Sequence, residues 1–551
     1  MKLRSKYIFL SIGIISYVFF SYKPLKFDLT EDKRFTLDSA SKKVLNNVKE
    51  DIQCEIYLCG DMSVHFKRLQ NQLFDLIQNA KNNSHNIFVK EIDIQNLDQT
   101  EKEKTVKTLG QMGLFATNIM QVEKGKRVGH VIYPFVVLKK NNGQHVGINL
   151  LTSNKMLSQE EMINKSIENL EYNFFSGLQQ LITENKNKIA IVTGHNEPLD
   201  IRTLGLMSTL RMNYDLSLVK LDGSCLEKRN QALIILKPTE KFSEEEKFVL
   251  DQYVMRGGKV LFFIDRMKTN MEELIKGKSF AVVQDLNLDD MLFKYGVRLE
   301  YNLIKDLQSG LFPIVTGNVG NQPQITLMTI PFLVLATPND KHVISKNINQ
   351  VYTKFVSKIS PIQVANVKHT PLLFSSFYSH CVGNPVVFDL NELKHEPDRK
   401  VYCQGPLPVA YLMEGKFSSL YKGRMAPEGF EKVDQIIEGE SKILVTSGAD
   451  LALNAVSPTK KNIFPLGMDP FTQQQFSNQD FILSALSYMI DDIGLINAKN
   501  KNYKIHLLDN KIVAEHSLLI QIVNILLPML LNLVFAVVFY IKRKRSLTCR
   551  N

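Results

Sequence analysis

The sequence predicts an α/β protein whose folded body is flanked by one transmembrane helix at each end. The last uncharged run, Ser517 to Ile541, is followed by Lys542, Arg543, Lys544 and Arg545. At about 1.5 Å per residue, this run of about 25 residues can cross a hydrocarbon core of about 30 Å. A second uncharged run, Tyr7 to Tyr22, lies near the amino terminus. Between the two runs, strand patterns alternate with helix patterns, which is typical of α/β folds.

Composition indicates a folded protein of several domains. The chain has 551 residues, too many for one hydrophobic core, with 22% charged and 44% hydrophobic residues. The net charge of +11 comes from Lys and Arg residues spread along the chain, which does not favour nucleic-acid binding. The six cysteines include no C-x-x-C pair and no zinc-ligand spacing, so no metal and no cofactor is expected.

The amino-terminal run is expected to be a retained anchor. It has about 16 residues, slightly short for a bilayer, but Lys6 and Lys23 can snorkel to the interface. A cleaved signal peptide is the alternative, although Phe19 to Lys23 offers no small-x-small cleavage site. The basic cluster 542–545 marks the cytoplasmic side of the second span. Both termini are therefore predicted to be cytoplasmic, with the main body outside the inner membrane.

Residues 23–155 are expected to form a small α/β domain. The predicted elements are strand 52–58, helix 64–80, strand 87–94, helix 99–112, and strands 115–123, 127–138 and 145–151. The order β-α-β-α-β-β indicates a thioredoxin-like fold. Cys59 is followed by Gly60 and Asp61, so the redox cysteine pair is missing. We therefore expect a binding scaffold without redox chemistry.

A bridging helix over 156–185 is expected to lead into a larger domain, 186–500. Ser158 and Glu161 form a capping box at the start of this helix. The larger domain alternates strands 188–193, 215–221, 232–236, 259–264 and 442–446 with helices 199–212, 243–255 and 478–491. This alternation predicts a parallel sheet of flavodoxin-like or Rossmann-like type. Residues 279–439 are expected to be irregular, with short strands at 385–390 and 408–413. Residues 501–516 are expected to be juxtamembrane and 542–551 a cytoplasmic tail.

Polar residues follow several of these strands. Gly194, His195, Asn196 and Glu197 come after the first one, at the edge where open α/β sheets bind ligands. His and Glu can serve acid–base or metal chemistry, but a tight turn with a polar helix cap is the alternative. Asp265 and Asp450 follow two other strands, and each could line the same edge or serve as a helix N-cap.

Nucleotide hydrolysis is not expected. Gly277, Lys278 and Ser279 resemble the end of a phosphate-binding loop, but the required glycine is replaced by Glu272. No catalytic residue is therefore assigned, and the protein is expected not to be an enzyme.

The carboxy-terminal helix carries a polar stripe. Gln521, Asn524, Pro528 and Asn532 are spaced by three, four and four residues, which places them on one helix face. Amides in hydrocarbon are costly unless they are paired. This face is therefore expected to contact another transmembrane helix, although single amides can also be tolerated.

Several blocks resemble GldG, the gliding-motility-associated auxiliary component of an ABC transporter in Bacteroidota. They are FDLTEDKRFTL (27–37), GGKVLFFID (257–265), MLFKYGVRLEYNLIKDL (291–307), PVAYLMEGKFSSLY (408–421) and the segment 464–508 with PLGMDPFTQQQFSNQDF. The resemblance implies a membrane-anchored periplasmic subunit that works with a separate ATPase and a separate permease, in gliding or secretion. The resemblance assigns no catalytic residue to this chain.

The chain departs from the GldG family pattern at two turns. Asn196 stands where the family tends to have Gly, and Ser447-Gly448-Ala449-Asp450 stands where it tends to have Asp-Gly-Asp. If these turns bind a ligand, this protein binds it differently. Two alternatives remain, an envelope enzyme with a site at His195 and Glu197, and a cell-wall or glycan-binding module. The substrate is not evident.

Overall fold

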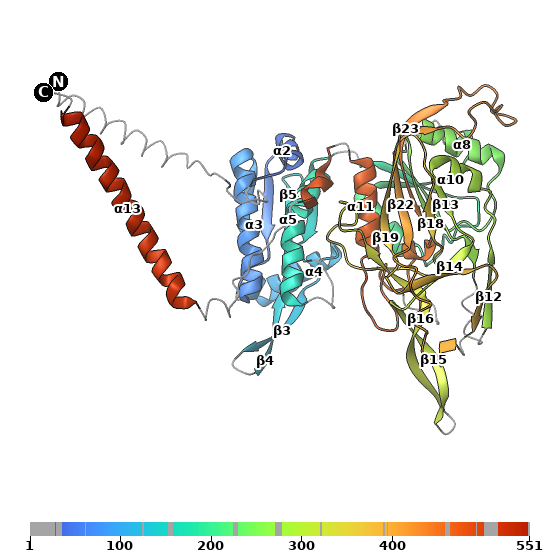
Figure 1. Cartoon of the computed structure of the whole chain (residues 1–551), viewed down its shortest axis with the longest axis horizontal. Helices are drawn as coiled ribbons and strands as arrows, with labels where there is room; N and C mark the ends of the chain where they lie inside the picture. Colours follow the sequence, from blue (N-terminus) through green and yellow to red (C-terminus); the bar gives the residue numbers. More distant parts are fainter. Residues whose placement is uncertain are drawn as a thin grey trace. The chain divides into compact units, whose positions relative to one another are not determined.

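The structure is a computed structural model. It describes residues 28, 36–60, 62–123, 126–151, 158–183, 186–223, 230–269, 278–319, 322–389, 392–393, 395–457, 463–491, 493–500 and 516–548. The predicted amino-terminal span, 7–22, lies outside these residues. The chain divides into two compact units, Met1–Asn502 and Tyr503–Asn551. The described residues form a mixed α/β structure with nine α-helices (Figure 1).

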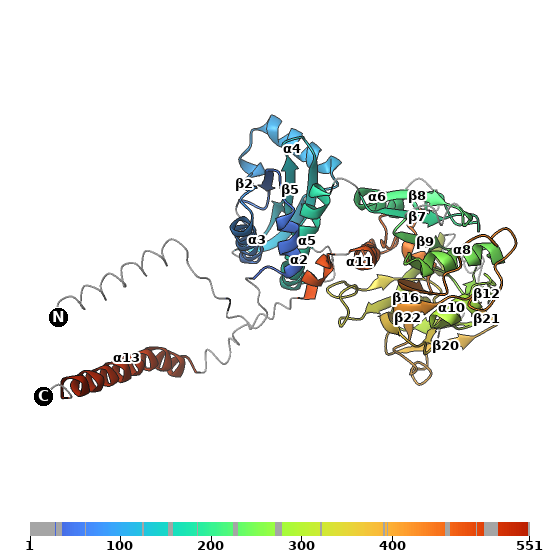
Figure 2. The same cartoon turned by 90° about the horizontal axis from the view of Figure 1, so that it is seen from above.

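A four-stranded sheet with the strand order β2-β1-β5-β6 begins the first unit. Its strands are β1 (Ile52–Ile56), β2 (Ile87–Glu91), β5 (Phe135–Lys140) and β6 (His145–Asn149). β1 and β2 are parallel and are joined by α3 (Val64–Asn83), whose buried side chains recur at helical spacing. α2 (Ser39–Asn46), α3 and α5 (Gln159–Ile182) contact one another beside this sheet (Figure 2). The predicted capping box of Ser158 and Glu161 at the start of α5 is confirmed.

The sequence prediction is wrong for the predicted strand 127–138. Residues 127–138 do not form one strand, because Pro134 lacks the amide hydrogen that would continue the ladder. The segment splits into β4 (Lys126–Ile132) and β5, and β4 pairs with β3 (Thr117–Glu123) in a separate ribbon. η1 (Ile94–Asn96) and α4 (Gln99–Gln111) precede this ribbon.

The large sheet has a parallel half with the strand order β8-β7-β9-β10-β23. Its strands are β7 (Lys188–Val192), β8 (Asp215–Val219), β9 (Ala232–Leu236), β10 (Lys259–Phe263) and β23 (Glu438–Thr446). Alternate residues of β7 and β9 face two different cores. One core includes α6 (Leu204–Asn213) and α11 (Asn478–Ile490), and the other includes α8 (Glu244–Met255) and α10 (Asp289–Tyr295). Both faces of the parallel half are thus covered, as its continuous apolar strands require.

The other half of the large sheet is antiparallel, and of its strands only part of one, at 408–413, was predicted. It contains β15 (Ser309–Val319), β16 (Gln322–Pro338), β19 (Val367–Phe374) and β22 (Pro408–Ser418), with β17 (Val351–Tyr352) pairing beside β16. Smaller pairs are formed by β11 (Met267–Lys268), β12 (Lys278–Val283) and β21 (Val386–Asp389), by β13 (Val297–Leu299) and β18 (Ile359–Pro361), and by β14 (Asn302–Asp306) and β20 (Ser379–Gly383). The predicted short strands 385–390 and 408–413 correspond to β21 and to part of β22, but the expectation that the rest of 279–439 is irregular is wrong. Pro371 lies beside a register shift in β19, which explains how a proline fits within a strand.

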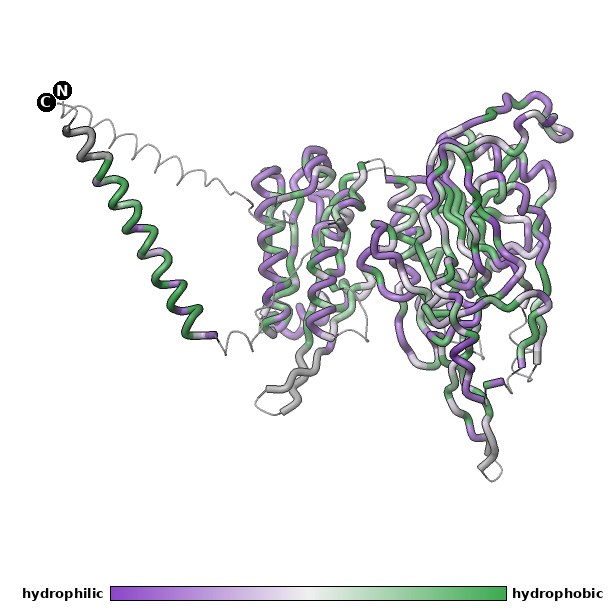
Figure 3. Tube along the Cα trace, in the orientation of Figure 1, coloured by the Kyte–Doolittle hydropathy of each residue, from purple (hydrophilic) through white to green (hydrophobic). Residues whose placement is uncertain are grey.

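The second unit contains α13 (Ser517–Thr548), which continues through the four basic residues that follow the predicted span. Within α13, the 25 residues Ser517–Ile541 are long and apolar enough to cross a membrane, by length and composition. Figure 3 shows the hydrophobic colouring that runs along this helix, with a few hydrophilic positions.

Candidate functional site at the carboxyl edge of the parallel sheet

The turn after β7 is held together by Glu197. Its Oε2 accepts hydrogen bonds from the backbone amides of Gly194 (3.0 Å) and His195 (2.9 Å). Gly194 has a φ of 127° and Asn196 a φ of 57°, so both adopt backbone conformations with positive φ. The Asn196 side chain donates to the hydroxyl of Thr239, which follows β9. The turn is therefore tied to the neighbouring strand as well as to itself.

His195 is enclosed by carboxylates and an aromatic ring. The residue is 1% exposed and stacks on Phe242, with ring centroids 3.7 Å apart. Its Nδ1 lies 3.2 Å from Oε1 of Glu197, and its Nε2 lies 3.1 Å from Oε2 of Glu246 on α8. The second contact is an ion-pair approach without hydrogen-bond alignment. Phe242 and Glu246 were not predicted from the sequence, because neither follows a strand directly.

The two carboxylates set the charge of this histidine. Burial lowers the pKa of His195, but Glu197 and Glu246 outweigh burial and raise it above its ordinary value. Burial raises the pKa of Glu197, but hydrogen bonds from His195 and from backbone amides outweigh burial and lower it. His195 and Glu197 are thus stabilised as a buried ion pair.

Asp265 and Asp450 meet at the same sheet edge, and Lys237 lies between them. The Nζ atom of Lys237 is 2.7 Å from Oδ2 of Asp450 and 3.3 Å from Oδ2 of Asp265. Asp265 also accepts the backbone amide of Ala449, at the start of η3 (Ala449–Ala452), at 2.7 Å. Lys237 directly follows β9. The rule that residues after parallel strands line the carboxyl edge, which predicted the two aspartates, therefore also predicts Lys237.

The structure places neither aspartate at the N-cap position of a helix. Asp450 lies within η3, whose N-cap residue is Gly448, and Asp265 accepts the first amide of η3 from outside that helix. Burial raises the pKa of Asp265 despite Lys237, whereas Lys237 and other cations hold the pKa of Asp450 below its usual range. Burial lowers the pKa of Lys237, but the two carboxylates outweigh it and raise the pKa.

The predicted edge residues therefore belong to two clusters, and in each cluster one basic side chain lies between two carboxylates. Within the described residues, no group of three His, Cys, Asp or Glu side chains is arranged to hold a metal ion. Of the residues that resembled a phosphate-binding loop, Lys278 and Ser279 lie in β12 and pair with β21. A strand at this position does not present the helix N-terminus that such a loop requires.

On α13, the predicted amide stripe has one internal bond. The Asn532 side chain donates to the carbonyl oxygen of Pro528 at 3.0 Å. Pro528 has no amide hydrogen, so it cannot donate to the carbonyl of Asn524 one turn earlier. The stripe thus presents the amides of Gln521 and Asn524 together with a backbone carbonyl that lacks its usual helical donor.

The chain is similar to known protein families over both parts of its first unit. A family model described as an ABC-type uncharacterized transport system matches residues 186–485, and a domain of unknown function (DUF7088) matches residues 31–139. A relative from Borreliella burgdorferi, described as an uncharacterized protein, is 23% identical over 434 residues, which cover 75% of this chain and 78% of that protein. A solved structure of the mmIFT52 N-terminal domain covers 58% of this chain and 100% of its own at 13% identity, with a TM-score of 0.32, too low to support an argument. Because the first family model covers more than half of the chain, the protein belongs to the family of auxiliary components of ABC-type transport systems.

Proposed function

We propose that the protein is a non-enzymatic, membrane-anchored accessory subunit of an ABC transporter, with its main body in the periplasm. Family membership supports an accessory role in a transport system. In this proposal the body binds a substrate or partner, and the terminal helices dock on a separate permease that works with a separate ATPase. Both termini lie in the cytoplasm of the bacterial cell.

The observation that carries this proposal is the composition of α13. Its apolar segment of 25 residues carries Gln521, Asn524 and Asn532 on one face. Polar groups in hydrocarbon are stabilised by partners on another helix. Because Pro528 cannot donate to the carbonyl of Asn524, this face has both amides and a carbonyl to offer to a permease helix.

The body is interpreted as a thioredoxin-like domain followed by a flavodoxin-like domain. In chain order, the parallel strands β7, β8, β9, β10 and β23 are arranged 2-1-3-4-5, the order of flavodoxin-like sheets. The family models match 31–139 and 186–485, which fall within the expected domains 23–155 and 186–500. These observations support the two-domain interpretation, with 156–185 as the bridging helix.

The burial of His195 favours a binding role over an envelope enzyme. The residue is 1% exposed and both of its ring nitrogens face carboxylates. A general base must come within hydrogen-bond reach of its substrate, and here the imidazole is buried with a carboxylate beside each ring nitrogen. The link to gliding motility or secretion in Bacteroidota rests on the resemblance to GldG.

Co-purification from mild detergent at native expression tests the proposal. We expect the full-length protein to be isolated together with a permease and an ATPase. Isolation of the protein alone under these conditions would contradict the accessory role. Replacing both His195 and Glu197 with Ala distinguishes the accessory subunit from the enzymatic alternative. A variant that folds and reaches the membrane should keep its function if the protein is a binding subunit, and should lose it if the protein is an enzyme with a site at these residues.

A further inference from the structure

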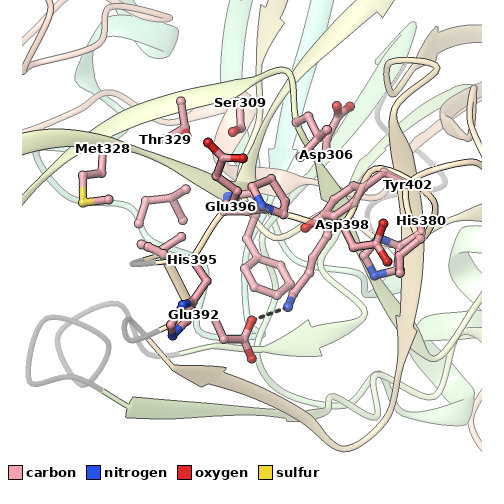
Figure 4. Close-up of a pocket in the computed structure, with 18 of the residues that line it drawn as sticks. Asp306, Ser309, Met328, Thr329, His380, Glu392, His395, Glu396, Asp398 and Tyr402 are labelled. Carbon is pink, nitrogen blue, oxygen red and sulfur yellow. Dashed lines mark hydrogen bonds and ion pairs between the residues drawn. The ribbon is translucent and has the colours of Figure 1, made fainter.

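A cavity of about 320 Å³ lies beside the antiparallel half of the large sheet (Figure 4). It is lined by the end of β14, the start of β15, the middle of β16, β20, the end of β21 and the segment 392–402. None of the residues of the two charged clusters described above lines it. The volume is that of a site for a small ligand or a single long side chain.

The inner wall of this pocket is apolar and rigid. Ile330 and Phe388 are 2% exposed and Phe332 is 5% exposed, and all three line the cavity. The rings of Phe332 and Phe388 pack edge to face with centroids 4.4 Å apart. Such a wall favours the apolar stem of a ligand.

Two polar atoms in the pocket wall have no hydrogen-bond partner among the described residues. Ser309 is 9% exposed, and its Oγ is buried and unpaired. The Nδ1 atom of His380 is also unpaired, and its ring packs edge to face on Tyr402 at 4.5 Å. Buried polar groups in folded proteins nearly always form hydrogen bonds. The unpaired Ser309 hydroxyl and His380 nitrogen therefore indicate that a polar group of a ligand can bind here.

The charge of the lining is strongly negative. Its carboxylates are Asp306, Asp389, Glu392, Glu396 and Asp398, and its one Lys or Arg residue is Lys305. Lys305 is already paired with Glu392 at 2.7 Å. Asp306 is buried and accepts bonds from the amide and hydroxyl of Ser376. Glu396, by contrast, has no hydrogen-bond or ion-pair partner within the described part of the chain, and Figure 4 shows it with Asp398 in the pocket lining.

The carboxylates are spread over the lining and do not converge on a point. No three His, Cys, Asp or Glu side chains among the described residues could hold a metal ion together. A compact divalent cation therefore does not fit this arrangement, whereas an organic cation with an apolar stem fits both the wall and the charge.

We propose that the pocket binds an alkylammonium or alkylguanidinium group, the chemistry of a lysine or arginine side chain. The stem lies on Ile330, Phe332 and Phe388, the cationic end meets Glu396 and Asp398, and the Ser309 hydroxyl accepts a hydrogen bond from it. The inference rests on the proposed function in one respect, that the body binds a substrate or partner. The same cation can come from a polypeptide or from a free amine.

Calorimetric titration of the full-length protein in mild detergent tests this assignment. The probes are Nα-acetylarginine amide and its neutral isostere Nα-acetylcitrulline amide. We expect the arginine probe to bind about tenfold more tightly, with an affinity that falls as salt is added. Equal affinities, or no binding of the arginine probe at millimolar concentration, would overturn the proposal.

A variant at the pocket sharpens the test. Glu396→Gln removes one charge at an exposed position, so folding should not change, and we expect the arginine probe to bind several-fold more weakly. Glu428→Gln is the matched control, because Glu428 is also an exposed carboxylate but does not line the pocket. Unchanged affinity in Glu396→Gln, or an equal loss in both variants, would contradict a site at this cavity.

Two further probes identify the source of the cation. Tighter binding of the peptide Gly-Gly-Arg-Gly-Gly than of pentylamine supports a polypeptide ligand, and the reverse supports a free amine; both outcomes support the cation site. Co-purification of Glu396→Gln with the permease and ATPase should stay normal. Loss of the cation site and loss of the accessory role are therefore distinguishable.

Discussion

The ammonium group of Lys237 lies 2.7 Å from the Oδ2 atom of Asp450, although the two residues are 213 positions apart in the chain. The contact joins the carboxyl ends of β9 and β23, which are separated in the sheet by β10. Asp265, which follows β10, contributes the second carboxylate at 3.3 Å. The ion pairs of one lysine thus connect three adjacent strands at the edge where the sequence predicts a ligand site.

Replacing Lys237 with Met should destabilise the body strongly. The change leaves the buried carboxylate of Asp265 and the partly buried carboxylate of Asp450 without their shared cation, and we expect a loss of about 3 kcal/mol in the free energy of unfolding. Urea unfolding of the full-length protein in detergent, followed by circular dichroism, measures the loss.

Lys241→Met is the matched control for this change. Lys241 pairs with Asp285 at 2.5 Å, but their side chains are 65% and 58% exposed, so the loss should stay below about 1 kcal/mol. If the two variants lose the same stability, the Lys237 pairs contribute no more than a surface ion pair.

The pair of His195 and Glu197 should make stability depend on pH. The raised pKa of His195 means that its contribution is fully present below about pH 6.5 and is lost as the pH rises through the folded pKa. The lowered pKa of Glu197 means that its contribution is present above about pH 4.5 and is lost as the pH falls through its folded pKa. The pair therefore contributes most between these two values.

His195→Gln isolates the alkaline side of this dependence. We expect the stability difference between the wild type and this variant to shrink between pH 6 and pH 9, because only the wild type loses a bound proton there. His145→Gln is the matched control, because it makes the same replacement at an exposed position. A difference for His195→Gln that stays constant with pH would show that the pKa of His195 is the same in the folded and the unfolded protein, which would contradict the prediction.

The sequence predicted those parts of the fold whose signals are local. The buried strands of the parallel half are continuous apolar runs, and the capping box of α5 is complete within four residues, so both could be identified from the sequence. The antiparallel half could not, because β15 and β16 carry Val315 and Ile325 exposed at 59% and 63%, with polar residues between the apolar ones. Such a hairpin lacks the clean alternation of a half-buried sheet.

The same limit applies to the candidate site. The rule that ligands lie at the carboxyl edge applies to Asp265 and Asp450, and it applies equally to Lys237, but it contains no information on which of these side chains contact one another. Those contacts depend on the strand order, and strand order depends on contacts that are distant in the chain. The sequence therefore predicted chemical groups at this edge but not the ion pairs that they form with Lys237 and Glu246.

Asn196 should be tolerated as Gly but not as Ala. Its φ of 57° lies in the left-handed region, which costs an ordinary L-residue such as Ala about 1 kcal/mol but costs Gly almost nothing. We expect Asn196→Ala to lower the free energy of unfolding by about that amount and Asn196→Gly to leave it nearly unchanged. Thr239→Ala, which removes the acceptor of the Asn196 side chain, measures the hydrogen bond alone. Equal losses for Asn196→Ala and Thr239→Ala would assign the effect to the hydrogen bond and exclude a backbone origin.

Replacing Gln521, Asn524 and Asn532 together with Leu should keep the protein in the membrane but release it from its partners. Leucine raises the hydropathy of α13 while removing the groups that could bond to another helix. The control replaces Leu519, Leu526 and Leu530, on the opposite face, with Ile, which changes the same number of residues without changing polarity. Membrane fractionation and co-purification with the permease and ATPase measure the two properties separately.

Asn532 already donates a hydrogen bond to Pro528 within its own helix, so Asn532→Leu alone should have the smallest effect of the three single changes. A complex that survives the triple change would place the docking contact elsewhere and leave the stripe as a tolerated polar face.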